Sequence, residues 1–177
     1  MNTPTRISSI VLAALLAGCA ATVQAPTADQ PRVDVPAAAA KKIVLVVKGS
    51  DKAAASGDWE PLRAEWRSAM SAAAADAAIA FEWRDSEARL PRGAGTAVVV
   101  KVNDYRYLST GARFGLGAFA GNAFMDADVV FRDLQSGRAF GNRKYNTSST
   151  AWQGVFSAMT SKQVEAISKE IVSEVVR

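Results

Sequence analysis

Residues 123–133, with the sequence AFMDADVVFRD, carry the clearest periodicity in the chain. Apolar residues occupy every second position: Ala123, Met125, Ala127, Val129 and Phe131. They alternate with Asp126, Asp128 and Arg132. Because successive side chains of a strand point to opposite faces, this pattern predicts a strand with one apolar face and one solvated face. The chain must therefore build a sheet that other elements cover on one side.

The segments around this strand predict the rest of the sheet. Residues 133–140, DLQSGRAF, indicate a tight turn with Gly137 in the left-handed conformation, and residues 138–149 then form an antiparallel partner strand. Upstream, residues 41–49 have the continuous apolar core of a strand that is buried on both faces. Residues 79–84 and 96–108 are two further strands, and in the second the alternation slips at Asn103 and Asp104, which predicts a β-bulge.

Two segments have helical periodicity. Residues 58–78 place Leu62, Trp66, Ala69 and Ala73 on one side, with Asp58 as the expected N-cap. Residues 160–177 do the same with Val164, Ile167, Ile171 and Val175, and Thr160 and Gln163 fit a capping box. We therefore expect an α+β fold, a mixed and mainly antiparallel sheet of about five strands with two helices packed on one face.

Several kinds of chemistry are excluded by composition. The 177 residues contain no histidine and one cysteine, which removes the commonest general base, the usual zinc sites and any internal disulfide. The 21 basic residues are scattered among 17 acidic ones, so the basic stripe of a nucleic-acid-binding protein is missing. We predict no cofactor site, no metal site and no nucleic-acid partner.

The N-terminus has the pattern of a signal peptide. Arg6 is followed by ISSIVLAALLA, an apolar run that is too short to span a bilayer, which needs about 20 residues. Small residues then precede the single cysteine in the sequence Leu16-Ala17-Gly18-Cys19. This sequence resembles the bacterial lipoprotein signal.

The resemblance implies that residues 1–18 are removed and that Cys19 becomes an acylated first residue. It also implies outer-membrane sorting, since Ala20 rather than an aspartate follows the cysteine. The alternative is ordinary secretion with cleavage after Ala25, which would discard Cys19. Residues 19–42, rich in Ala and Pro, are expected to be a tether about 25 Å long, and residues 43–177 a single domain.

The domain also resembles a family of uncharacterised bacterial lipoprotein domains, with a long strand, a glycine-rich connection, a hairpin and a terminal helix. The matching stretches are residues 113–121, 133–137 and 161–177. The family lends no established activity. Within the first stretch, GLGAFA matches a dinucleotide-binding string, but a strand and not a helix follows it, so we expect no nucleotide there.

Two sets of residues are candidate sites. Asp126 and Asp128 share one strand face about 7 Å apart, a spacing that would suit the acid and base of a hydrolase, but a solvated face explains them better. The glycine-rich segment 111–124 carries four large apolar residues, Phe114, Leu116, Phe119 and Phe124. They form either a contact loop for a partner or membrane, or a lid that folds back on the core.

The tryptophans are open to a similar pair of interpretations. Trp59, Trp66, Trp83 and Trp152 could line a ligand groove, but Trp59 and Trp66 fall on the helix face that must be buried, which favours core packing.

We therefore expect a lipid-anchored outer-membrane protein that faces the periplasm. Its domain would act as a non-enzymatic binding or assembly module of the cell envelope, with an envelope protein or a second copy as partner. The alternative function is an exported hydrolase that uses Asp126 and Asp128.

Overall fold

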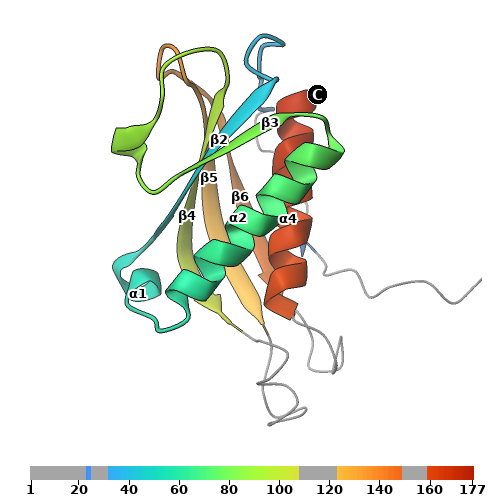
Figure 1. Ribbon diagram of the computed structural model, residues 1–177. Helices are drawn as coiled ribbons and strands as arrows, with labels where there is room; N and C mark the ends of the chain where they lie inside the picture. Colours follow the sequence, from blue (N-terminus) through green and yellow to red (C-terminus); the bar gives the residue numbers. More distant parts are fainter. Residues whose placement is uncertain (1–22, 25–31, 108–122, 149–158) are drawn as a thin grey trace, which may run out of the picture.

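The computed structural model describes residues 23–24, 32–107, 123–148 and 159–177. The elements are β1 (Val23–Gln24), β2 (Lys42–Gly49), α1 (Asp51–Ala54), α2 (Trp59–Asp76), β3 (Ala80–Arg84), η1 (Glu87–Arg89), β4 (Thr96–Arg106), β5 (Phe124–Asp133), β6 (Ala139–Ser148) and α4 (Met159–Val176). Helices α2 and α4 lie side by side across one face of a sheet with the strand order β1-β6-β5-β4-β2-β3 (Figure 1). The predicted α+β fold is confirmed.

Strand β2 is buried on both faces, as its continuous apolar sequence predicts. Five consecutive residues, 43–47, are buried, and β2 pairs in parallel with both β3 and β4. On the helix side of the sheet, Leu62 and Trp66 of α2 belong to the same core as Leu45. We call the other side the back face. There Val44 packs with Ala97 and Leu134.

The segment between β3 and β4 crosses the back face. Leu90 of this segment packs on the cluster around Val44, and Glu87 forms ion pairs with Lys48 of β2 and Arg132 of β5. Because Glu87 is joined to two different strands, the 85–95 segment is held over the part of the back face where Val44 lies. Farther along β5, the back face carries Asp126, Asp128 and Arg132 together with the apolar residues Phe124 and Val130.

The two long helices bury the predicted stripes. Every residue predicted for these stripes is buried: Leu62, Trp66, Ala69 and Ala73 in α2, and Val164, Ile167, Ile171 and Val175 in α4. The predicted caps differ. Asp58 is the N-cap of α2 but its side chain makes no capping hydrogen bond, since its backbone is not extended there. In α4 the Gln163 amide donates to the carbonyl oxygen of Ala123 instead of completing a capping box.

A short helix precedes α2 and was not predicted. Ser50 is the N-cap of α1, and its hydroxyl accepts a hydrogen bond from the backbone N–H of Ala53 at 3.1 Å. Gly49 permits this approach, because a Cβ at that position would lie 2.9 Å from the backbone nitrogen of Ala54. The glycine that ends β2 is thus required by the turn that follows it.

The antiparallel half of the sheet matches the sequence closely. The register between β4 and β5 shifts between Val102 and Asp104, which confirms the bulge at Asn103. The five apolar residues of 123–131 are all buried, whereas Asp126 and Asp128 are partly exposed. Gly137 has φ 72°, which confirms the left-handed turn, and Asp133 accepts hydrogen bonds from Gln135 and Ser136 within it.

The N-terminal segment packs more closely than its composition suggests. Strand β1 pairs antiparallel with β6 and becomes a sixth strand at the edge of the sheet. Val33 and Ala39 are buried, and a Cβ on Gly141 of β6 would lie 3.2 Å from a methyl carbon of Val33. The packed part of the chain therefore begins before residue 43 and includes residues that composition assigns to a tether.

A buried ion pair joins β6 to α4. Arg143 donates from Nε and Nη2 to the two carboxylate oxygens of Glu174 at 3.2 and 3.1 Å, and the two side chains are only 4% and 6% exposed. Arg177 also donates to Glu174. Beside them Tyr145 is fully buried, and its hydroxyl has no hydrogen-bond partner in the described part of the chain. Burial, reinforced by the Glu174 charge, raises the pKa of Tyr145.

This environment predicts a specific alkaline sensitivity. The raised pKa means that folded Tyr145 stays protonated while the unfolded tyrosine ionises near pH 10, so the stability it contributes is intact below pH 10 and falls as the pH rises above it. The loss should approach about 1.4 kcal/mol per pH unit. Tyr145→Phe should abolish this component while leaving stability at pH 7 equal or higher. Urea unfolding of both proteins from pH 8 to 11.5 checks this, and parallel pH profiles would contradict it.

Candidate functional site

The two aspartates proposed as a catalytic pair lie on the back face, each with its own partner. Asp128 accepts a hydrogen bond from Nδ2 of Asn103 at 2.7 Å. Asp128 lies on β5, between β4 and β6. In the strand register it is opposite Lys101 on β4 and Lys144 on β6. Asp126 lies 3.5 Å from Nζ of Lys144. Opposite charges directly across neighbouring strands stabilise a sheet. Both carboxylates therefore have a structural role: they form polar contacts between neighbouring strands on the back face.

The neighbouring Asp104 is also engaged. Its carboxylate accepts a hydrogen bond from Lys52 of α1 at 2.6 Å, and this bond is the main reason that the pKa of Asp104 lies below its ordinary value. No cluster of three or more metal-binding side chains occurs in the described ranges. Likewise, none of the helices described is long and apolar enough to cross a membrane.

Of the four residues of the predicted contact loop, the structure describes one. Phe124 begins β5 and is 36% exposed on the back face, in register with Arg106 of β4. Phe114, Leu116 and Phe119 lie outside the described residues, as do Cys19 and Trp152. The choice between contact loop and core lid therefore stays a prediction for the first three. Phe124 itself is partly accessible to solvent.

The remaining tryptophans occupy different environments. Trp66 is fully buried, as predicted, and Trp59 is partly buried against Tyr105, with ring centroids 6.3 Å apart. Trp83 lies on β3 and is held from two sides. Its Nε1 donates to Asp85 at 3.0 Å, and the guanidinium of Arg63 lies 5.3 Å from its ring centroid. Arg63 also donates to Asp85, so the three side chains fix one orientation of the indole.

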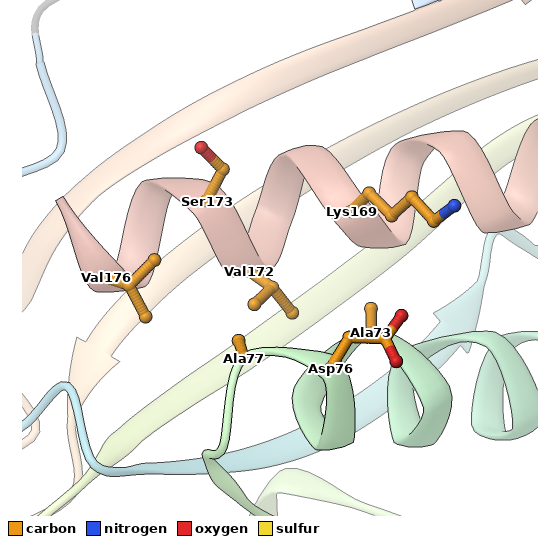
Figure 2. Close-up of a pocket in the computed structure, with 7 residues that line it drawn as sticks. All are labelled: Ala73, Asp76, Ala77, Lys169, Val172, Ser173 and Val176. Carbon is orange, nitrogen blue, oxygen red and sulfur yellow. The ribbon is translucent and has the colours of Figure 1, made fainter.

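Two of the grooves on the described surface lie beside α2, one between α2 and α4 and the other between α2 and β3. Figure 2 shows the first, a shallow hollow of about 320 Å³ between the C-terminal halves of α2 and α4. Its lining includes Ala73 and Ala77 on one side and Val172 and Val176 on the other, with Asp76 and Lys169 at the rim. The small α2 side chains that let the helices approach leave this hollow between them.

The second groove lies between α2 and β3 and measures about 770 Å³. Aromatic residues Phe81 and Trp83 form its strand side. Its helix side is formed by Arg67 and a set of small residues, Ala64, Ser68, Ser71, Ala72 and Ala75. All five of these small residues are exposed. Because these side chains are short, another molecule can come close to the backbone of α2 along this groove.

Strand β3, which forms one side of this groove, is also an edge strand of the sheet. It pairs with β2 on one side and ends the sheet order on the other, so its outer edge has no strand partner among the described residues. An edge strand presents unpaired backbone N–H and C=O groups that can pair with another chain. Sequence periodicity predicted the strand but could not show that it lies at an edge, since the order of strands depends on the parallel pairing of β2.

Comparisons with known proteins identify the fold but no family. No family model matches the sequence, and no curated protein matches it. Among solved structures, the PelC dodecamer from Paraburkholderia phytofirmans aligns with a TM-score of 0.52 and 12% identity over 87% of this chain and 96% of that chain. A variant of the same dodecamer aligns with a TM-score of 0.53 and 13% identity over 87% of this chain and 95% of that chain.

A third structure, described only as an uncharacterized protein, aligns with a TM-score of 0.51 and 11% identity over 82% of this chain and 96% of that chain. At these identities the likeness shows a common fold.

The contact between Asn103 and Asp128 provides a test of the structural role of the aspartates. Removing either side chain should cost about 0.5–1.5 kcal/mol of the free energy of unfolding, the usual contribution of one hydrogen bond. Because both changes remove the same bond, Asn103→Ala and Asp128→Ala should be less than additive in a double-mutant cycle. Chemical denaturation of the four proteins measures this, and strictly additive effects would show that the bond contributes nothing.

Proposed function

We propose that this protein is exported, anchored by lipid on Cys19, and acts in the cell envelope as a non-enzymatic module that assembles with further copies of itself. The observation that carries the assembly is the open outer edge of β3, beside the groove that Phe81 and Trp83 line. The fold likeness to PelC, which was solved as a dodecamer, supports assembly as something this fold can do.

The sequence of β3 is self-complementary. If two copies pair their β3 strands antiparallel about Trp83, Glu82 of each copy faces Arg84 of the other on the same side of the joined sheet. Each such opposite-charge pair contributes roughly 0.2–1 kcal/mol. The two Trp83 rings face each other on the helix side, where the small residues of α2 leave room. The pairing would join two six-stranded sheets into one continuous sheet.

Within a single copy, Glu82 is shared between Lys42 and Arg84. Pairing would therefore extend an existing row of alternating charges instead of burying isolated ones. This matters because an unpaired charge at an interface costs more than it contributes.

The non-enzymatic part of the proposal is supported by the partners of Asp126 and Asp128. A general acid requires a carboxyl that burial keeps protonated, whereas these two face lysines and an asparagine on a partly exposed sheet face. The alternative of an exported hydrolase gains no observation in its favour.

The place in the envelope rests on the sequence alone. Leu16-Ala17-Gly18-Cys19 and the following Ala20 are the basis for proposing outer-membrane anchoring on the periplasmic side. An anchor with several acyl chains holds firmly, because each buried methylene contributes about 0.8 kcal/mol.

Lipidation makes a direct prediction about mass. The mature protein should begin at Cys19 and carry the added mass of its acyl chains, and Cys19→Ala should yield a soluble or unprocessed chain. Intact mass spectrometry of protein from membranes decides between these. A mature chain beginning at Pro26 without acyl mass would refute the anchor.

Self-association makes a second prediction, tested in the exported Cys19→Ala protein by analytical ultracentrifugation. In the paired strands, residue 82 of each copy faces Arg84 of the other. Glu82→Arg therefore creates two repulsive contacts between like charges and should weaken association about tenfold. Adding Arg84→Glu exchanges the two charges and should restore association. The matched control is Arg138→Glu, an exposed reversal on the distant β5–β6 turn. A protein that stays monomeric at all concentrations would refute the proposed assembly.

A further inference from the structure

The pairing of β1 fixes where the chain leaves the domain toward Cys19. Val23 pairs with Thr147 and Gln24 with Asn146, in antiparallel register. Moving back along the chain from Val23 toward Cys19 therefore means moving forward along β6 toward its end at Ser148. Cys19 lies only four residues before Val23, and four residues span at most about 14 Å.

Other elements terminate at the same end of the sheet. Because β5 runs antiparallel to both β4 and β6, the end of β4, the start of β5 and the end of β6 lie together, at the lower end of the sheet in Figure 1. The end of β2 joins them, since Gly49 pairs with Val102. We call this the anchor end and define it by Lys52, Arg106, Phe124 and Thr147. The β5–β6 turn and the C-terminus of α4 lie at the opposite end (Figure 1).

The surface at the anchor end combines an aromatic side chain with cations. Phe124 is 36% exposed and faces Arg106, itself exposed, across the β4–β5 pair. The side chain of Lys52 is 75% exposed and forms an ion pair with Asp104, so Lys52 reaches lipid phosphates only by sharing its charge with that carboxylate. The boundary between lipid headgroups and acyl chains accommodates such a surface, because an aromatic ring enters the apolar layer while neighbouring cations stay at the phosphates.

We propose that the anchor end faces the lipid bilayer and that Phe124 enters its headgroup region. This inference rests on the proposed lipidation of Cys19. A tether of residues 19–42 would hold the domain about 25 Å away with no fixed orientation. With β1 paired to β6, three residues remain between Cys19 and the sheet, so the lipid and the anchor end are held at one surface.

Site-directed labelling of the lipidated full-length protein tests the orientation. In the mature protein the Cys19 sulfur carries lipid, so a thiol-reactive fluorophore labels only an introduced cysteine. Asn146→Cys reports on the anchor end, and Gln135→Cys reports on the opposite turn; both positions are exposed. In vesicles of phosphatidylethanolamine and phosphatidylglycerol with nitroxide-labelled headgroups, the label at 146 should be quenched at least threefold more than the label at 135.

Phe124 and Val176 provide a matched pair of variants, because both are exposed large apolar residues. Phe124 begins β5 at the anchor end, and Val176 ends α4, whose C-terminus lies at the opposite end (Figure 1). Phe124→Ser should reduce quenching at position 146 about twofold with an unchanged melting temperature, whereas Val176→Ser should leave quenching unchanged. Equal quenching at 146 and 135 in protein that sediments with the vesicles would overturn the orientation and leave lipidation intact. Absence of acyl mass would overturn both.

Discussion

Burial of β2 on both faces is the constraint on which the rest of the structure depends. Five consecutive apolar residues must be covered from two sides, and the chain uses α2 for one side and the 85–95 segment for the other. Strands β3 and β4 both pair with β2 in parallel, so the chain has to cross the sheet twice. One outcome is that β3 becomes an edge strand. Another is that the back face along β5 and β6 stays free for paired charges.

The strand order also separates the two candidate functional surfaces, the outer edge of β3 and the anchor end beside β1. The open edge of β3 lies on one side of the sheet and β1 on the other. Assembly through β3 would therefore leave the β1 edge and the anchor end accessible. The buried pair of Arg143 and Glu174 secures α4 against β6, the strand to which β1 attaches. Removing one partner of such a pair would leave an uncompensated buried charge and loosen this edge.

Much of the fold could be predicted from sequence because it depends on local periodicity. The alternation of 123–133, the slip at Asn103 and the left-handed Gly137 are properties of a few neighbouring residues. Features that depend on distant partners could not be predicted. Nothing in Val23 and Gln24 indicates that they pair with β6, and Gln163 meets Ala123 only because tertiary packing brings them together.

The candidate sites divide in the same way. Phe124 is exposed, but the predicted contact segment to which it belongs stays a prediction, because its other large apolar residues lie outside the described ranges. The partners of Asp126 and Asp128 depend on strand register and were not visible in the sequence. The edge position of Trp83 was missed for the same reason, since strand order is a tertiary property. A run of alternating charge around an aromatic residue, as in Glu82-Trp83-Arg84, is the one local signal that could have drawn attention to it.

We propose that lipid on Cys19, four residues before the paired strand β1, holds the domain against the membrane. Neutron reflectometry of the lipidated protein on a supported bilayer measures this directly, because it resolves the water layer between headgroups and protein. The account predicts protein density that begins at the headgroups, with any gap no larger than the reach of about 14 Å from Cys19 to Val23. A water layer of about 25 Å, the reach of a free tether, would contradict it.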